Sequence, residues 1–259
     1  MSGEVIRLNI IEVYNLKFKN IFEDLSLVIP ENTIVSISGP NNCGKTTLIR
    51  ILSREIITEN ILINGKTSDN YKIEDYSNII QAVIPKEVTF YEKTIKEELK
   101  RKNYYPNKKL INSLKLNNSL NKDISELTDI EIIYTQILFS LLKGPKVLLL
   151  DSISLYLNDK EMEELLLFLK KYKEKYNLTI VFTTLNLKDS LYSDYLFIIN
   201  NGKVLLSGSP IEVLKYDNIL NKNGLEIPFI IDLSVKMMDY NLIDEPVLDM
   251  DRMVDTIWK

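Results

Sequence analysis

Apolar and polar residues alternate through residues 5–30, near the start of the chain. Successive side chains of a strand point to opposite faces of a sheet, so this alternation is typical of strands with one buried face. We therefore predict an antiparallel sheet here, with a second short pair of strands flanking residues 61–65. The apolar positions of the first segment include Phe18, Phe22, Leu25, Leu27 and Ile29.

Two later segments, residues 146–151 and 179–184, are nearly continuous apolar runs. Such runs are expected of parallel strands that helices cover on both faces. The sequence between them carries apolar residues at helical spacing, which predicts a crossover helix. The stripe consists of Met162, Leu165, Leu166, Leu169 and Tyr172.

Helix and turn patterns occupy much of the remaining chain. Residues 94–143 favour helices, with the clearest patterns at 94–99 and 132–142, and we expect the second to be a buried helix. Residues 195–199 and 203–206 predict a hairpin, because Asn201-Gly202 between them suits a tight turn. From Pro210 onward the pattern predicts short helices.

A glycine-containing loop provides the first candidate chemistry. It follows the apolar run 33–38 and precedes the helical pattern 48–52, so strand, loop and helix come in the order of a phosphate-binding loop. Glycine lets the backbone turn its N–H groups toward phosphate oxygens. We expect Lys45 to reach the outer phosphates and Thr46 to bind Mg²⁺. The bland alternative is an ordinary turn. The predicted loop is Gly39, Pro40, Asn41, Asn42, Cys43, Gly44, Lys45, Thr46 and Thr47.

Asp151 ends one of the predicted parallel strands. Ligands of open α/β sheets gather at the carboxyl ends of the strands, so Asp151 should lie beside the phosphate loop. We predict that Thr46 and Asp151 together serve the metal ion. The alternative is an aspartate that only caps the next turn.

Composition limits the class of protein. The chain has 259 residues, a net charge of −4 and a pI near 5.2, which argues against a nucleic-acid binder. The lone Cys43 cannot form an internal disulfide and is interpreted as a small residue at a variable loop position, in a reducing compartment. We see no signal peptide and no apolar stretch near the roughly 20 residues of a membrane span, so a soluble protein is expected.

The chain resembles the ATP-binding subunits of ABC transporters, and among them most closely the ATPase subunits of energy-coupling factor (ECF) importers. The likeness covers nearly the whole chain and depends on the phosphate loop, on residues 145–151, on residues 202–210 and on the tail motif 223–229. It implies an α/β P-loop NTPase core with an antiparallel β subdomain. It further implies a nucleotide-binding domain over residues 1–209, a helical subdomain at about 88–143 and a helical C-terminal extension over residues 210–259.

The resemblance also implies ATP and Mg²⁺ as cofactors. The expected partners are a second ABC ATPase subunit, in a heterodimer, and a transmembrane coupling subunit, without nucleic acid or a membrane span in this chain. The expected location is the cytoplasmic face of the membrane.

Several family residues for hydrolysis are replaced. Ser152 stands where the family has the glutamate that polarises water, and Leu185 stands where it has the switch histidine; the chain contains no histidine. Loss of a positioned base costs about 10² to 10⁴ in rate. No catalytic residue is therefore assigned.

The family signature, which meets ATP on the opposite subunit, aligns with a degenerate segment. Thr128 and Glu131 have capping-box spacing, so a helix should begin there. Asp129 and Glu131 would place carboxylates toward the γ-phosphate, and Ile130 would replace a glycine. The segment is Leu127, Thr128, Asp129, Ile130 and Glu131.

Three further positions at which the family has functional residues are occupied differently in this chain or have no clear counterpart. The metal-sensing glutamine should lie near Val83 or Ile84, and Gln81 is expected to point elsewhere. Asn158 takes the place of an aspartate that contacts the other subunit. Phe18 is the candidate for adenine stacking, although packing into the sheet is favoured.

These observations lead to a principal hypothesis, an ATP-binding subunit with weak or absent hydrolysis. The alternative is a non-hydrolysing regulator or scaffold that uses nucleotide as a structural ligand. A small-molecule kinase is disfavoured, since the sequence has no visible acceptor site or lid. Tail residues are expected either to contact another subunit or to cover the core: Leu225, Ile227, Phe229, Ile230 and Leu233.

Overall fold

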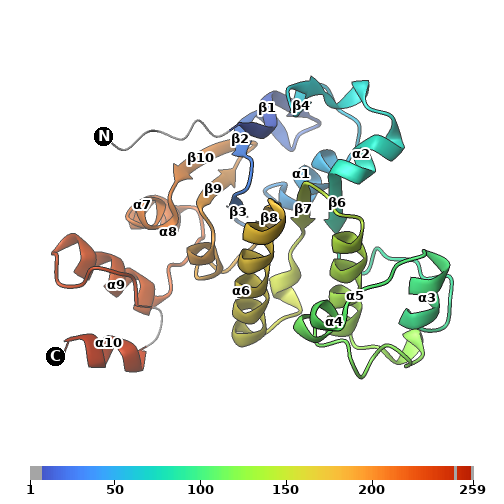
Figure 1. Cartoon of the computed structure of the whole chain (residues 1–259). Coiled ribbons are helices and arrows are strands. Elements are labelled where there is room, and N and C mark those ends of the chain that lie inside the picture. Colours follow the sequence, from blue (N-terminus) through green and yellow to red (C-terminus); the bar gives the residue numbers. More distant parts are fainter. Residues whose placement is uncertain (1–7, 248–249, 258–259) are drawn as a thin grey trace.

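The computed structural model describes residues 8–247 and 250–257 of the chain. Figure 1 shows a central sheet with a smaller sheet above it and helices on its other face. The two sheets have the strand orders β10-β9-β3-β8-β7-β6 and β2-β1-β4-β5. This is the α/β core with an antiparallel β subdomain that the sequence predicts.

The small sheet forms from the alternating N-terminal segment. Strands β1 (Asn9–Phe18) and β2 (Phe22–Pro30) pair antiparallel, and β4 (Ile61–Ile63) and β5 (Lys66–Thr67) extend the sheet beyond β1. The predicted strands are thus confirmed. The segment after β5 forms a helix, α2 (Ile73–Ile79), that the pattern did not predict.

The central sheet contains β3 (Ile34–Ser38), β6 (Ile80–Val83), β7 (Val147–Leu150) and β8 (Thr179–Thr183), each parallel to its neighbour. Strand β9 (Tyr195–Asn200) pairs parallel with β3 and antiparallel with β10 (Lys203–Gly208). The predicted hairpin is confirmed, because Asn201 and Gly202 both have positive φ, 49° and 71°.

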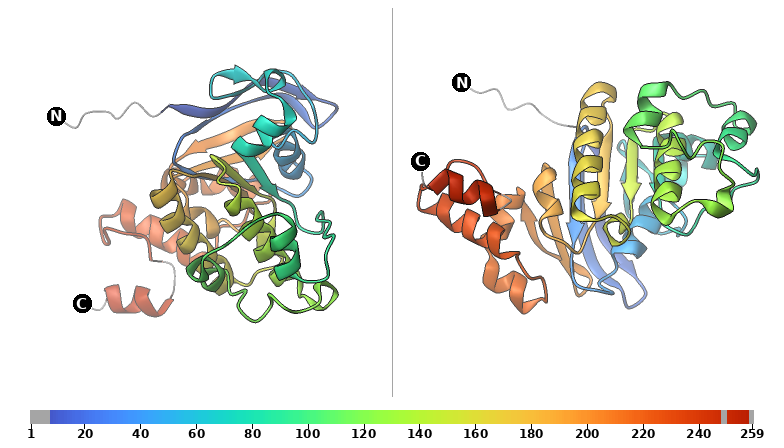
Figure 2. Two further views of the ribbon diagram at one scale, coloured as in Figure 1. Left: turned by 45° about the vertical axis from the view of Figure 1, so that its right-hand side comes forward. Right: turned by 90° about the horizontal axis from the view of Figure 1, so that it is seen from below.

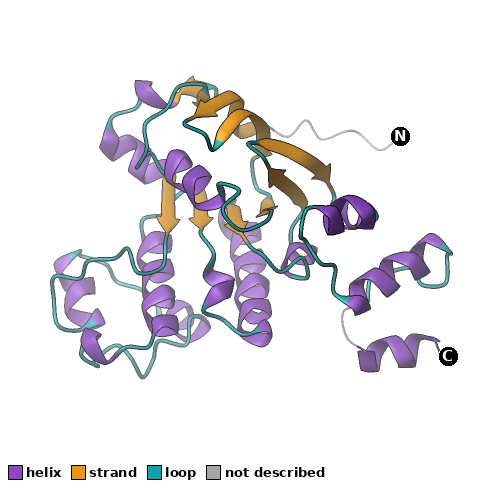
Figure 3. Cartoon of the chain, turned by 180° about the vertical axis from the view of Figure 1, so that it is seen from behind, coloured by secondary structure: helices purple, strands orange, loops and turns teal. Residues whose placement is uncertain are grey.

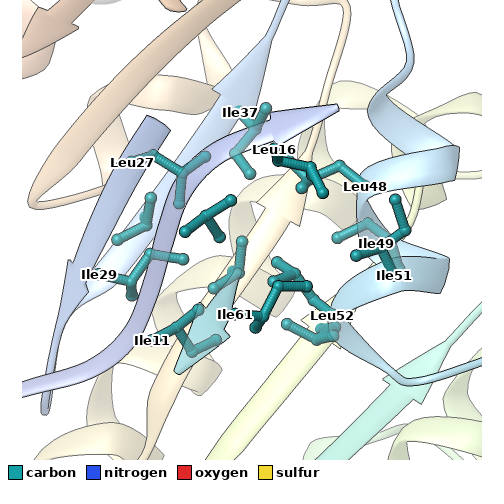
Figure 4. Packing of buried hydrophobic residues seen from close by; sticks show 14 of the residues in the cluster. Ile11, Leu16, Leu27, Ile29, Ile37, Leu48, Ile49, Ile51, Leu52 and Ile61 are labelled. Carbon is teal, nitrogen blue, oxygen red and sulfur yellow. The ribbon is translucent and has the colours of Figure 1, made fainter. Parts of the chain in front are cut away.

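Each face of the central sheet packs into a different core. In β7, Val147 and Leu149 belong to one cluster, whereas Leu148 and Leu150 belong to another. The first cluster lies between the two sheets and includes helix α1 (Lys45–Leu52). Figure 4 shows side chains of α1, of the small sheet and of β3 meeting there. Burial on both faces explains the continuous apolar sequence of β7 and β8.

The second face is covered by long helices. Helix α5 (Asp129–Leu142) is largely buried, and α6 (Asp159–Tyr176) connects β7 to β8. Four of the five residues of the predicted stripe on α6 are buried, and Tyr172 is partly buried. The shorter helices α3 (Ile95–Arg101) and α4 (Lys108–Ser113) lie with α5 at one end of the molecule (Figure 2).

The C-terminal helices lie at the opposite end, as Figures 2 and 3 show. They are α7 (Pro210–Leu214), α8 (Asp217–Lys222), α9 (Phe229–Asp239) and α10 (Met250–Ile257). Leu225 is buried in a third core cluster with Leu196 and Ile198 of β9. Phe229, in contrast, is 67% exposed. Within the described residues, no helix has the length and apolar character needed to span a bilayer.

The ring of Phe22 gives a test of the core beneath the phosphate loop. Phe22 begins β2, is 1% exposed and lies beside Gly44. Replacing Phe22 by alanine should lower the free energy of unfolding by about 3–5 kcal/mol, because a buried aromatic ring is lost. Phe229→Ala is the matched control, with an expected change within about 0.5 kcal/mol, since that ring is exposed. Urea denaturation of both variants measures the difference, and equal losses would contradict this packing.

Candidate phosphate-binding site

The loop between β3 and α1 can form only with glycine at two positions. A Cβ atom on Gly39 would collide with the carbonyl oxygen of Ile199. Gly44 has φ of 104°, and a Cβ atom there would lie 2.7 Å from side-chain atoms of Ile21 and Phe22. The loop is therefore held tightly against β9 and the small sheet, and it leads directly into the first turn of α1.

Lys45, the first residue of α1, folds back over this loop. Its Nζ atom donates hydrogen bonds to the carbonyl oxygens of Gly39 at 2.6 Å and Pro40 at 2.8 Å. The Sγ atom of Cys43 lies 3.6 Å from the same amine. Lys45 is 8% exposed, so its positive charge is fixed near the loop rather than extended into solvent. A fixed ammonium group is suited to bind phosphate oxygens.

Thr46 and Asp151 meet as the sequence predicts. The Oγ1 atom of Thr46 donates to Oδ2 of Asp151 at 2.8 Å, although 105 residues separate the two in the chain. Asp151 directly follows β7 and is 3% exposed. Its backbone N–H donates to the carbonyl oxygen of Val83, which continues the pairing of β7 with β6. The carboxylate is thus placed by the sheet rather than by a free loop.

These groups are compatible with Mg²⁺ bound together with a nucleotide. A hydroxyl and a carboxylate supply hard oxygen ligands, and Mg²⁺ in phosphate sites commonly takes its other ligands from phosphate and water. No group of three or more Asp, Glu, His or Cys residues that could hold a metal occurs in the described ranges. The two residues therefore suit a metal ion that arrives with its nucleotide, to which it would add positive charge near the outer phosphates.

A cavity of about 390 Å³ opens beside the loop. Ser152 and Leu185, the residues expected at the positions of the family's glutamate and histidine, both line it. The lining also contains two further apolar residues, Ile21 and Leu155, and Leu155 is 65% exposed. None of the described lining residues carries a carboxylate or an imidazole. The remaining lining residues are Asn41, Asn42, Gly44, Lys45, Thr46 and Thr47.

Thr184, the residue directly before Leu185, makes a buried polar contact. Thr184 donates through Oγ1 to Oδ2 of Asp189 at 2.6 Å. Burial raises the pKa of Asp189 to about 6, against the lowering effect of this hydrogen bond. The contact fixes the turn that follows β8 and thereby fixes the position of Leu185.

The predicted signature segment does begin a helix. Thr128 caps α5, and its hydroxyl accepts from the backbone N–H of Glu131 while the Glu131 carboxylate accepts from the backbone N–H of Thr128. Glu131 also accepts from Ser119 at 2.5 Å and Lys122 at 2.8 Å. These two bonds lower the pKa of Glu131 to about 2.

The negative charge of Glu131 is therefore balanced by Lys122 within the same chain. The sequence-based expectation placed both Asp129 and Glu131 toward an incoming phosphate. In the structure only Asp129 remains exposed on the first turn of α5, whereas Glu131 turns back onto the helix end. Leu127 is buried, and Ile130 packs against the second core cluster.

Other predicted positions take structural contacts. The amide of Gln81 donates to the carbonyl oxygens of Ser77 and Ile80, and Gln81 does not line the phosphate cavity. Val83 and Ile84 are buried. Asn158 caps α6 by accepting from the backbone N–H of Glu161 at 2.9 Å.

Phe18 lies at the end of β1 and packs against the first core cluster. This is the packing position favoured from sequence, and Phe18 is not among the residues that line the phosphate cavity.

Sequence reasoning missed Thr183, Leu155 and Ile21. Thr183 donates a hydrogen bond to Asp151, and its polar side chain at the end of an apolar strand was an available signal. Leu155 and Ile21 had no signal, because their place beside the cavity depends on loops that follow β7 and β1.

Comparisons with known proteins identify the family of this chain. A family model described as "ABC transporter" matches residues 22–154. The ECF transporter ATP-binding protein EcfA1 of Mycoplasmopsis pulmonis is 23% identical, covering 97% of this chain and 98% of that protein. Its Mycoplasma mobile counterpart is 22% identical over the whole of both chains. The structure of cbiO1 from Clostridium perfringens, part of the ABC transporter complex cbiONQ, matches with a TM-score of 0.70, at 21% identity over 89% of this chain and 99% of that chain. The predicted resemblance and fold class are confirmed.

The lowered pKa of Glu131 predicts an acid-dependent loss of stability. Because its folded pKa of about 2 lies below the ordinary value of 4.5, the charged form stabilises the fold above pH 4.5, and this contribution disappears as pH falls toward 2. Glu131→Gln should lose stability relative to the wild type at pH 5, and the difference should shrink by pH 3. Urea midpoints at these pH values measure it.

Glu126→Gln is the matched control for that variant. Glu126 is exposed in the short helix before α5, and its carboxylate makes no hydrogen bond or ion pair with the described part of the chain. Its unfolding free energy should follow the wild type at every pH. A pH-independent difference for Glu131→Gln would refute the ionic contribution.

Proposed function

Because this chain belongs to the ABC transporter family, we propose that it is an ATP-binding subunit of an ECF-type or related transporter that holds Mg-ATP but hydrolyses it weakly or not at all. The observation that carries the proposal is one cavity in which Lys45 and Thr46 adjoin Ser152 and Leu185. The groups for binding are retained there, whereas the groups for hydrolysis are replaced.

The binding part of the proposal rests on positive charge and donors at the loop. Lys45, the start of α1 and loop residues 41, 42 and 44 all line the cavity. A helix N-terminus favours anions, and its unpaired N–H groups can donate to phosphate oxygens. Thr46 and Asp151 add the two oxygen ligands for Mg²⁺.

The weak hydrolysis rests on the chemistry of Ser152 and Leu185. A serine hydroxyl near neutral pH is a poor acceptor for a proton of the attacking water, and leucine has no acceptor at all. The neighbouring carboxylate, Asp151, already accepts hydrogen bonds from Thr46 and Thr183. Loss of the base alone costs about 10² to 10⁴ in rate.

Partners follow from the exposed apolar rim of the cavity and from the relatives. Leu155 is 65% exposed and Leu185 is 38% exposed, and a second ATPase subunit would cover both in a heterodimer. The relatives are named as ATP-binding proteins of energy-coupling factor transporters. We accordingly infer a transmembrane coupling subunit and a peripheral location on the cytoplasmic face of the membrane.

We also propose the division into residues 1–209 and a C-terminal extension of residues 210–259, with a helical subdomain at about 88–143. The extension serves both expected roles at once. Leu225 covers the core and Ile227, Ile230 pack against it, while the exposed Phe229 is available to another subunit.

Nucleotide binding by Lys45→Ala tests the proposal. The purified wild-type chain should bind Mg-ATP, and the substitution should weaken binding at least about tenfold, because a charge-assisted contact to phosphate is lost. Turnover by the wild type alone should stay below about 0.1 s⁻¹, which is a typical enzyme rate of about 10 s⁻¹ reduced by the missing base. Calorimetry and a phosphate-release assay supply the two measurements.

Lys203→Ala is the matched control, because Lys203 is 58% exposed on β10 and pairs with Glu23. Its affinity for Mg-ATP should equal that of the wild type. Turnover near 10 s⁻¹ by the unmixed protein would overturn the assignment of Ser152. Absence of nucleotide binding by the wild type would overturn the proposal as a whole.

A further inference from the structure

Thr183 lies directly beside Asp151 because of the strand register. Strands β7 and β8 are parallel neighbours, and Leu150 pairs with Phe182, so the next residue of each strand is Asp151 and Thr183. Thr183 is fully buried, with an exposed fraction of 0%. Its hydroxyl therefore has to find its partners inside the protein.

The Thr183 hydroxyl makes two short hydrogen bonds in opposite senses. It donates to Oδ1 of Asp151 at 2.7 Å and accepts from the backbone N–H of Ser152, also at 2.7 Å. The Ser152 hydroxyl donates to the same Oδ1 at 3.2 Å and lies 3.3 Å from the Thr183 hydroxyl. Two hydroxyls thus converge on one oxygen of Asp151.

The two oxygens of Asp151 consequently have different surroundings. Oδ1 is held by Thr183 and Ser152, whereas Oδ2 meets only Thr46 among the described contacts. A carboxylate held at one oxygen cannot rotate without breaking those bonds. Oδ2 remains directed at the Thr46 hydroxyl, the other group expected to bind the metal.

We propose that Thr183 is a positioning residue that holds Asp151 in the orientation needed for Mg²⁺ bound with nucleotide. This inference rests on the proposed function of the cavity. Thr183 does not itself line the cavity and makes no hydrogen bond to residues 39–47 among the described contacts, so it acts through Asp151 and Ser152. Its effect is confined to the metal-dependent part of nucleotide binding.

The Thr183 hydroxyl also supports the backbone at Ser152. Ser152 has φ of 50° and ψ of 30°, a left-handed conformation that is uncommon for residues other than glycine, asparagine and aspartate. The bond from its N–H to Thr183 fixes this turn. The backbone N–H of Ser152 is directed at Thr183, and its hydroxyl lies between Thr183 and Asp151, so the turn after β7 is built around the threonine hydroxyl.

A comparison of Thr183→Val with a matched substitution separates positioning from simple stability. Thr179 lies at the other end of β8, is also 0% exposed and accepts from the backbone N–H of Asn32 at 2.8 Å. Thr179→Val therefore removes an equally buried hydroxyl from the same strand, far along β8 from Asp151. Calorimetry measures the Kd of ATP for each variant, once with excess Mg²⁺ and once with EDTA.

Thr183→Val should raise the Kd of Mg-ATP about tenfold, the lower end of the effect of losing a hydrogen bond to a charged group. The Kd of metal-free ATP should stay within about twofold of wild type, because Lys45 and the loop are untouched. Thr183→Ser, which retains the hydroxyl, should restore the Mg-ATP affinity. Thr179→Val should change neither constant, although it lowers the Tm.

Three outcomes would overturn the inference. One is an unchanged Kd of Mg-ATP in Thr183→Val while Lys45→Ala abolishes binding, which leaves the proposed function standing. Another is an equal loss with and without Mg²⁺, which is the result of a merely structural role. The third is a wild type that binds no ATP, which removes the proposed function as well.

If Thr183→Val does not fold, Thr183→Cys replaces it in the same comparison. A thiol is close in size to the hydroxyl-bearing group but is a weak donor and acceptor. The Kd of Mg-ATP should then rise by a smaller factor than tenfold, with Thr183→Ser near wild type. An affinity for Mg-ATP equal to wild type in a folded Thr183→Cys would count against positioning.

Discussion

The hydrogen bond from Thr46 to Asp151 joins the first turn of α1 to the end of β7. The two residues follow strands that are not neighbours, since Thr46 comes after β3 and Asp151 after β7, and β8 lies between these strands in the sheet. The contact therefore forms only when the whole parallel sheet is assembled in this order. The loop, the carboxylate and the turn after β7 reach their places through that one requirement.

The two cores on either side of the sheet enforce the order. Val147 and Leu149 pack toward α1, whereas Leu148 and Leu150 pack toward α5 and α6, so a one-residue slip of β7 would exchange the two faces. Asp151 would then no longer lie beside Thr183. Hydrophobic packing of the two cores thus fixes the position of the site, although the contacts within the site are polar.

Local sequence predicted the elements whose causes are local. The continuous apolar runs of β7 and β8, the Asn201-Gly202 turn and the capping box of Thr128 with Glu131 each depend on a few adjacent residues. Thr46 and Asp151 could be placed together because the carboxyl ends of parallel strands share one edge. What could not be predicted depends on residues brought from other segments. Thr183 is beside Asp151 only through register, and Glu131 accepts hydrogen bonds from Ser119 and Lys122, which precede its helix.

The proposed retention of binding without hydrolysis would have a simple physical basis in this arrangement. Phosphate contacts from the loop, from Lys45 and from a metal would act on a bound nucleotide before any reaction begins, so they would lower the free energy of the ground state and the transition state alike. Rate enhancement requires groups that interact more strongly with the transition state, such as a base for the attacking water. At that point the chain places Ser152, whose hydroxyl is directed at Asp151 and Thr183, and Leu185, which has no polar atom in its side chain. If Thr183 positions Asp151 as we propose, the same group of hydrogen bonds engages Ser152, the residue at the position that would have to act on water. Firmer binding of Mg-ATP and slower hydrolysis would then have a common origin.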